Sequence, residues 1–120
     1  MSLSPPVPIL RIFDLDKARA FYLDYLGFTL DWEHRFEPTL PAYWQLTRAD
    51  CVLHLSEHHG DACPGAALRI DCADVDGLLA ELQAKPYGYA RPSIEPMPWG
   101  TRELSLRDPF GNRLVFVGEG

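Results

Sequence analysis

The segment Leu10-Arg11-Ile12-Phe13-Asp14-Leu15-Asp16 decides how the rest of the chain is interpreted, because parts of it occur twice. Its first triplet returns as Leu68-Arg69-Ile70, an offset of 58 residues, and its last triplet returns in the form Asp74-Val75-Asp76, an offset of 60. Self-similarity at nearly the same offset indicates duplication of a structural unit. We therefore expect two similar units in tandem within the 120 residues.

The first copy predicts a strand, a helix and three more strands. Residues 7–13 are apolar and β-branched, and Asp14 suits the N-cap of a helix. Apolar side chains then recur at helical spacing, at Ala18, Phe21, Tyr22, Tyr25 and Leu26. Gly27 is expected to end this helix. Strands follow over residues 28–36, 43–47 and 51–56, with a break at 37–41 and a turn at 48–50.

The second copy predicts the same order of elements. A strand over 66–71 precedes a helix that begins at Asp74 and stops before Pro86. A weaker strand over 87–93, a loop over 94–98 and strands over 101–107 and 113–117 complete it. The sequence therefore predicts an α+β fold with one domain, 1–120, built from module one (about 7–57) and module two (about 65–118). Units this small are expected to share one core, with the sheets around a cleft.

Composition excludes several classes of function. The chain has 11 Lys and Arg against 17 Asp and Glu, a formal net charge of −6, so we expect neither a nucleic-acid nor a membrane partner. It has no apolar run long enough to span a bilayer and no signal-peptide pattern, which predicts a cytoplasmic protein. Its three cysteines lack Cys-x-x-Cys spacing and are expected to stay reduced.

Two motifs carry a resemblance to a known family. The stretch from Asp14 to Tyr22 leading to Tyr25-Leu26-Gly27-Phe28, together with the closing Asp108-Pro109-Phe110-Gly111-Asn112-Arg113, resembles the vicinal oxygen chelate superfamily of glyoxalases, bleomycin resistance proteins and extradiol dioxygenases. The resemblance implies two βαβββ modules that form a half-open barrel around a cleft. The stretch Pro98-Trp99-Gly100-Thr101-Arg102-Glu103 most resembles the bleomycin-binding members, which sequester the drug without altering it.

The metal site of the superfamily's enzymes is expected to be missing. The resemblance places its four ligands at Val7, His54, Gly65 and Val115, of which only His54 has a donor atom. We therefore predict no metal, no cofactor and no catalytic residue. A relocated metal around His54 and His58 remains the alternative, because alternation on a strand would point both side chains the same way.

Two tryptophans are the main candidates for ligand binding. Trp32 lies between Asp31 and Glu33, and we expect these two acidic side chains to face away from the indole. Indole faces set among carboxylates suit a planar cationic ligand. By resemblance Trp32 and Trp99 match aromatic positions of the drug groove, and Phe36 matches more loosely. The alternative is that both indoles close the barrel mouth or a dimer interface.

Two polar residues complete the predicted ligand-binding set. His54 is expected to face the cleft, whether as a ligand contact or simply as a packed, hydrogen-bonded histidine. Alternation along its strand leaves open whether Glu103 faces the cleft or the solvent.

These features predict a metal-free binding protein that sequesters a cationic aromatic antibiotic of the bleomycin type and confers resistance. The alternatives are a lyase or dioxygenase of the same fold with a relocated metal, and a binder of an unrelated metabolite. The resemblance also implies a homodimer whose grooves are built from both chains. Val7-Pro8-Ile9 resembles the segment at which such relatives exchange their first strand. Pro8 is then either the hinge of that exchange or an ordinary strand-start proline.

Overall fold

The computed structural model describes residues 1–120 and shows two units of like topology. Module one contains β1 (Ile9–Arg11), α1 (Leu15–Ala18), the π-helical continuation η1 (Arg19–Tyr25), β2 (Thr29–His34), β3 (Tyr43–Arg48) and β4 (Cys51–Ser56). Module two contains β5 (Ala67–Asp71), α2 (Val75–Gln83), β6 (Ile94–Pro96), β7 (Thr101–Arg107) and β8 (Arg113–Glu119). The predicted βαβββ order is confirmed in both modules.

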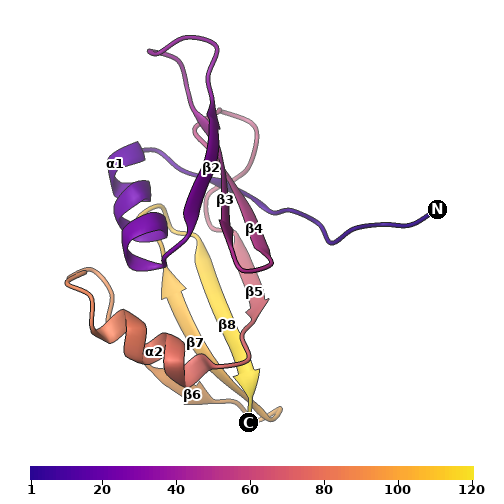
Figure 1. The fold of residues 1–120 in the computed structure, drawn as a ribbon, viewed down its shortest axis with the longest axis vertical. Helices are drawn as coiled ribbons and strands as arrows, with labels where there is room; N and C mark the ends of the chain where they lie inside the picture. Colours follow the sequence, from indigo (N-terminus) through magenta and orange to yellow (C-terminus); the bar gives the residue numbers. More distant parts are fainter.

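Each module forms a four-stranded sheet covered on one face by its helix. The strand orders are β1-β4-β3-β2 and β5-β8-β7-β6, so the first strand of each module pairs in parallel with the last. Ile9 is opposite His54 in the first sheet, and Arg69 is opposite Val115 in the second. The first sheet lies above the second, with both helices on the left of the view (Figure 1). Neither helix has the length and apolar composition needed to cross a membrane.

The first helix forms as its sequence predicts. The Asp14 carboxylate accepts a hydrogen bond from the backbone N–H of Lys17 at 2.9 Å, the arrangement of an N-cap. All five side chains of the predicted apolar face are at most 2% exposed: Ala18, Phe21, Tyr22, Tyr25 and Leu26. Gly27 follows with φ +73°, a left-handed conformation that glycine adopts without strain.

One strand was predicted in the wrong place. Residues 87–93 form no strand, and β6 lies instead at Ile94–Pro96, within the segment predicted to be a loop. The Tyr87 ring stacks on Tyr25 of the first module at 4.5 Å between centroids, which holds this part of the chain against η1. Ile94 is the first residue in register with β7, opposite Leu104. A contact between modules therefore overrides the local strand preference.

A buried hydrogen-bonded group joins the modules, and we call Tyr22, Asp108 and Asn112 the inter-module clamp. The Tyr22 hydroxyl donates to Asp108 at 2.6 Å, and the Asn112 amide donates to Asp108 at 2.8 Å and to the carbonyl of Arg11 at 3.0 Å. Burial raises the pKa of Tyr22, so the phenol keeps the proton that it donates. The clamp ties module one to the turn between β7 and β8.

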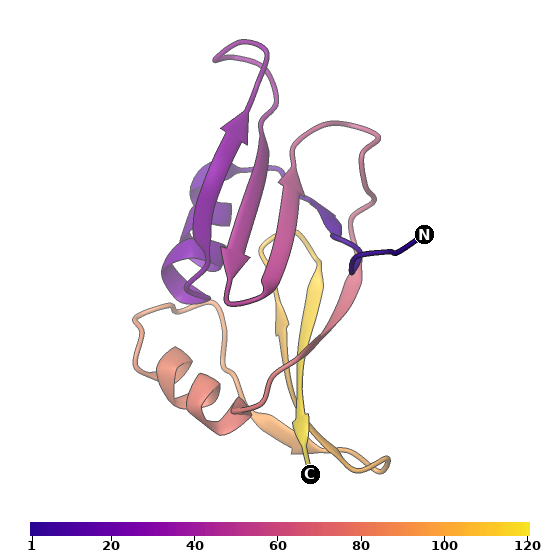
Figure 2. The same ribbon diagram turned by 45° about the vertical axis from the view of Figure 1, so that its right-hand side comes forward.

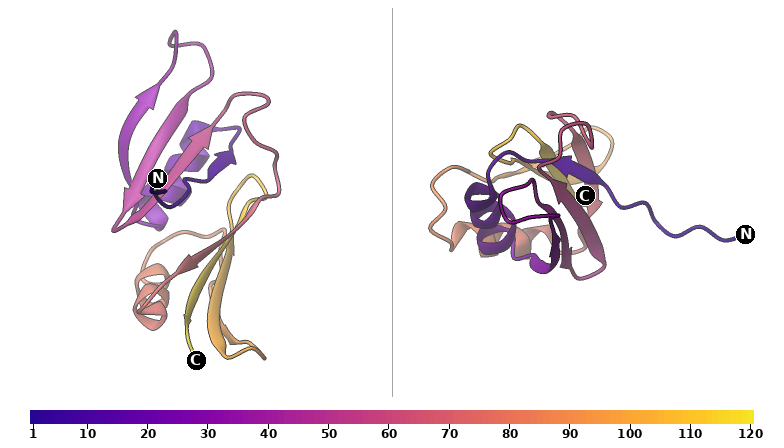
Figure 3. Two further views of the ribbon diagram at one scale, coloured as in Figure 1. Left: turned by 90° about the vertical axis from the view of Figure 1, so that its right-hand side faces the viewer. Right: turned by 90° about the horizontal axis from the view of Figure 1, so that it is seen from above.

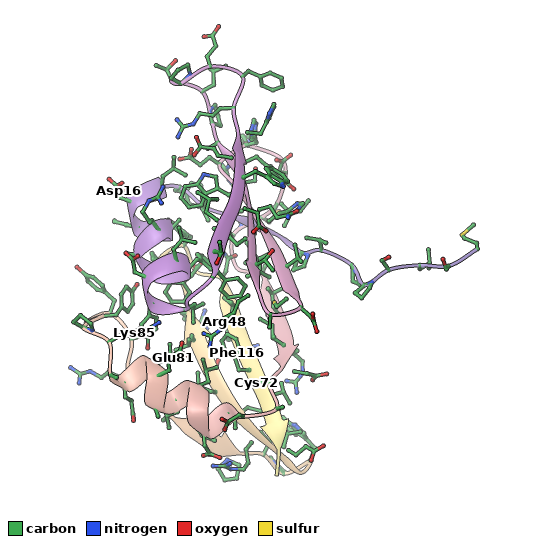
Figure 4. All side chains as sticks on the ribbon, viewed as in Figure 1. Asp16, Arg48, Cys72, Glu81, Lys85 and Phe116 are labelled. Carbon is green, nitrogen blue, oxygen red and sulfur yellow. The ribbon has the colours of Figure 1, made fainter.

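A second set of contacts lies nearer the helices (Figure 4). The Arg48 guanidinium donates to both carboxylate oxygens of Glu81 at 2.7 and 2.8 Å and to the carbonyl of Leu26 at 2.7 Å. Lys85 of module two donates to the carbonyl of Tyr25 at 2.7 Å. The modules are thus attached at two separate places.

We expect Tyr22→Phe to lower the free energy of unfolding by about 1.5–3 kcal/mol, because it removes a buried donor from a carboxylate. Urea unfolding followed by circular dichroism measures the change. Tyr89→Phe is the control, since that side chain is 91% exposed and should leave stability unaltered. A Tyr22→Phe protein as stable as the control would show that the clamp does not hold the modules together.

Candidate binding site on the open faces of the sheets

Apart from Phe36, the candidate site residues lie on or against the face of each sheet turned away from its helix, which we call the open face. Alternation along the strands buries Leu53 and Leu55 of β4, and Leu104 and Leu106 of β7, beneath the helices. The side chains between them therefore point to the open face. The strands of the first sheet lie in front of helix α1 in the left panel of Figure 3.

Three rings form an aromatic cluster on the open face of the first sheet. Trp32 stacks on Tyr43, with centroids 6.0 Å apart and an interplanar angle of 12°. It also makes an edge-to-face contact with the His54 ring, with centroids 5.6 Å apart. Trp32 remains 43% exposed, so part of the indole is free for a ligand.

A β-bulge brings Asp31 to the same face as Trp32. The pairing of β2 with β3 shifts between Leu30 and Trp32, which leaves Asp31 without a partner of its own. Its carboxylate accepts hydrogen bonds from Gln45 at 3.0 Å and from Thr47. The expectation that Asp31 faces away from the indole is therefore wrong. Glu33 does turn to the helix side, where it accepts from Trp44 at 2.6 Å.

His54 uses both ring nitrogens in hydrogen bonds within its own sheet. Nδ1 is 2.7 Å from the Tyr43 hydroxyl, and Nε2 is 3.0 Å from Oε1 of Gln45. Burial lowers the pKa of His54, which keeps the ring neutral at pH 7. His54 thus has neighbours that satisfy it completely.

The residues at the superfamily's metal-ligand positions do not fit a metal. Val7, Gly65 and Val115 have no donor, and both nitrogens of His54 are already bonded. The alternation proposed for His54 and His58 fails because β4 ends at Ser56. The chain nowhere gathers three or more His, Cys, Asp or Glu side chains into a possible metal site.

The second sheet carries its own cluster, centred on Glu103. This side chain lies on the open face but is only 4% exposed, because its neighbours cover it. Arg69 donates to it at 2.9 and 3.2 Å, Thr101 at 2.6 Å and the Trp99 indole at 3.0 Å. These donors, Arg69 foremost, lower the pKa of Glu103 to about 2. Arg69 and Trp99 stay exposed above it.

Phe36 lies apart from both clusters. It follows the end of β2 and is 76% exposed, with its ring against His34 at 5.0 Å between centroids. The structure therefore places Trp32 with His54, and Trp99 with Glu103, and leaves Phe36 in a separate loop.

Three residues of these clusters were missed from the sequence: Tyr43, Gln45 and Arg69. Strand alternation could have found them. Tyr43 and Gln45 flank the buried Trp44, and Arg69 lies between two apolar residues of β5. A polar side chain in such a strand must face away from the core.

A cavity of about 1080 Å³ adjoins the second cluster and is lined by neither tryptophan. It is bounded by the β3–β4 turn, strand β5 and the N-terminal prolines Pro5, Pro6 and Pro8. Arg69 contributes to its wall, so the cavity reaches the edge of the second open face.

Two βαβββ modules with helices on one side and open sheet faces on the other define the class of proteins related to glyoxalases and bleomycin resistance proteins. The family model described as glyoxalase superfamily protein matches residues 2–119. The chain therefore belongs to the glyoxalase superfamily.

Several solved structures share the fold. The bleomycin-binding protein of Streptomyces verticillus, complexed with copper(II)-bleomycin, is 29% identical over 100% of this chain and 99% of its own, with a TM-score of 0.73. TnmS3, an antibiotic binding protein from Streptomyces sp. CB03234, is 26% identical over the same shares, with a TM-score of 0.74. A bleomycin resistance determinant encoded on transposon Tn5 is 22% identical over 98% of both chains, with a TM-score of 0.75. No curated protein sequence matches the chain.

The low pKa of Glu103 predicts a pH dependence of stability. The stabilisation from this carboxylate is fully present above its ordinary pKa of 4.5 and is lost as the pH falls through about 2. We expect Glu103→Gln to flatten the decline of the unfolding free energy over that range. Urea unfolding at a series of pH values measures it, with the exposed loop variant Glu37→Gln as control. Parallel curves for Glu103→Gln and the parent would exclude the Arg69–Glu103 pair as the cause.

Proposed function

We propose that this protein sequesters a cationic aromatic antibiotic of the bleomycin type in the cytoplasm, without altering it chemically, and so confers resistance. The observation that carries the proposal is the pair of exposed indoles at the open sheet faces. Trp32 stacks on Tyr43, and Trp99 donates a hydrogen bond to Glu103. The two Streptomyces proteins of 29% and 26% identity support it, since one is described as a bleomycin-binding and the other as an antibiotic binding protein.

Each indole is fixed in a way that leaves a ring face available. The Nε1–H of Trp99 donates to Glu103, and Trp99 remains 63% exposed. Trp32 uses one face against Tyr43. Hydrogen bonds from Thr47 and Gln45 lower the pKa of Asp31, so a carboxylate lies on the same face as Trp32 at pH 7. A planar cation stacked on Trp32 gains both cation–π attraction and this negative charge.

We propose further that the binding groove is completed in a two-fold homodimer. One chain alone leaves both open faces uncovered, with Val7, Ile9, Trp32 and Trp99 all exposed. The N-terminal segment extends away from the body of its own chain in the right panel of Figure 3. Its pairing with β4 starts only at Pro8, whose carbonyl accepts from the His54 N–H at 3.0 Å. Pro8 is therefore suited to be the hinge of an exchanged strand.

Metal-free bleomycin is expected to quench tryptophan fluorescence on binding. Loss of one stacking indole should cost about 1–2 kcal/mol, so we expect Trp99→Ala to weaken binding by about 5- to 30-fold. Titration followed by the fluorescence of the two remaining tryptophans, Trp32 and the buried Trp44, gives the affinity. Tyr89→Ala removes an exposed ring outside both clusters and should bind like the parent. An unchanged affinity for Trp99→Ala would refute this binding site.

Light scattering at micromolar concentration is expected to give twice the 13.6 kDa mass of one chain. Deletion of residues 1–6 separates the two parts of the proposal. If the first strand is exchanged, the shortened chain should dissociate at higher concentration than the parent. A dimer of unchanged stability would refute the exchange alone, whereas a monomeric parent would refute the shared groove as well.

A further inference from the structure

We propose that the Tyr43 oxygen accepts a hydrogen bond from the cationic or donor group of the ligand, because a chain of hydrogen bonds from Asp31 fixes the direction in which its hydroxyl donates. The inference rests on the proposed ligand-binding function. It adds that the cluster on the first sheet accepts hydrogen bonds from the ligand. It follows from the hydrogen bonds that join four side chains of strands β2, β3 and β4. These strands lie side by side in the first sheet (Figure 2).

Asp31 is the first member of this series of hydrogen bonds and sets the direction in which the others donate. An ionised carboxylate has no proton and can only accept hydrogen bonds. The group 3.0 Å away from it must therefore be the NH₂ of Gln45. The carbonyl oxygen of the same amide then points to His54, because the opposite orientation would set two acceptors against each other.

The proton on His54 is fixed by the same reasoning. Its Nε2 lies 3.0 Å from the Gln45 carbonyl oxygen and must carry the hydrogen. A neutral imidazole with a proton on Nε2 has a bare lone pair on Nδ1. The Tyr43 hydroxyl, 2.7 Å from Nδ1, therefore donates its only proton to the ring.

Tyr43 consequently presents only oxygen lone pairs to a ligand. Burial and the charge of Asp61 raise the pKa of Tyr43, so the phenol stays protonated and oriented. The oxygen belongs to the ring on which Trp32 stacks. The guanidinium carbon of Arg11, a cation of the same sheet, lies 4.7 Å from the centroid of the Phe13 ring. A flat amidinium or guanidinium group beside Trp32 can thus donate an N–H to Tyr43.

The second sheet has the opposite polarity. Glu103 accepts from three neighbouring side chains, and the group left exposed beside Trp99 is the guanidinium of Arg69, which can only donate. A ligand group that donates is therefore directed to the first sheet and one that accepts to the second.

The proton position is tested by ¹⁵N NMR of the His54 ring at pH 7. The parent should show a neutral imidazole protonated on Nε2. Asp31→Asn removes the obligatory acceptor, so the Gln45 amide can turn and a mixture of both tautomers is expected. A His54 ring protonated on Nδ1 in the parent would overturn the proposal. So would a His54 ring that keeps the parental tautomer in the Asp31→Asn variant.

Binding polarity is tested with benzamidine and benzoate, two ligands of similar shape and opposite charge, by NMR titration to millimolar concentration. Benzamidine should shift the Trp32 and Tyr43 signals more than benzoate does. Tyr43→Phe should weaken this response at least about fivefold, since it removes a hydrogen bond to a charged donor. The control Tyr89→Phe removes a phenol hydroxyl outside both clusters and should leave the response unchanged. Benzoate preference at Trp32, an unaffected Tyr43→Phe, or no benzamidine response at Trp32 would each overturn the assignment.

These results are independent of bleomycin. If benzamidine binding depends on Tyr43 but bleomycin does not bind, the hydrogen-bond-accepting role of Tyr43 is supported and the proposed antibiotic is wrong. If bleomycin binds but benzamidine behaves alike in the parent and Tyr43→Phe, the sequestering function stands and the role of Tyr43 is wrong.

Discussion

The placement of both open faces depends on one buried carboxylate, Asp108. A charge that is only 6% exposed is costly unless several donors surround it. Asp108 receives the Tyr22 hydroxyl of module one, the Asn112 amide and two backbone N–H groups of its own turn. Asn112 also reaches the carbonyl of Arg11. The full set of donors exists only when the modules adjoin, so satisfaction of the charge fixes their relative position.

A single attachment would leave the modules free to rotate, and Arg48 supplies the second. Its planar guanidinium holds Glu81 of α2 and the carbonyl of Leu26, a fixed geometry that a lysine could not reproduce. With two attachments, both helices stay on one side of the molecule (Figure 1). The open faces are then free on the other side, and each sheet presents its own indole.

Local signals fixed the parts of the fold that could be predicted. The first helix has an acidic cap at Asp14, one apolar face and a terminal glycine at Gly27. Strands β4 and β7 match their predicted ranges residue for residue. The strand expected over 87–93 failed because Tyr87 packs on the other module, a contact that no local pattern contains. The orientation predicted for Asp31 was wrong for a similar reason, because the bulge arises only where β2 pairs with β3. Both tryptophans, His54 and Glu103 could be selected from the sequence. Their partners Tyr43, Gln45 and Arg69 were missed, although strand alternation would have placed them on the same faces.

Among the four metal-ligand positions that the resemblance implies, His54 alone has a donor atom. A half-buried imidazole without a metal needs partners for both nitrogens, and β3 supplies them in Tyr43 and Gln45. A metal at this place would attract electron-rich oxygen atoms of a substrate. The hydrogen-bonded chain that ends at Tyr43 instead offers an electron-rich oxygen of its own. The role proposed for Tyr43 thus favours N–H donors of a ligand at this place in the fold, where a metal would favour oxygen atoms.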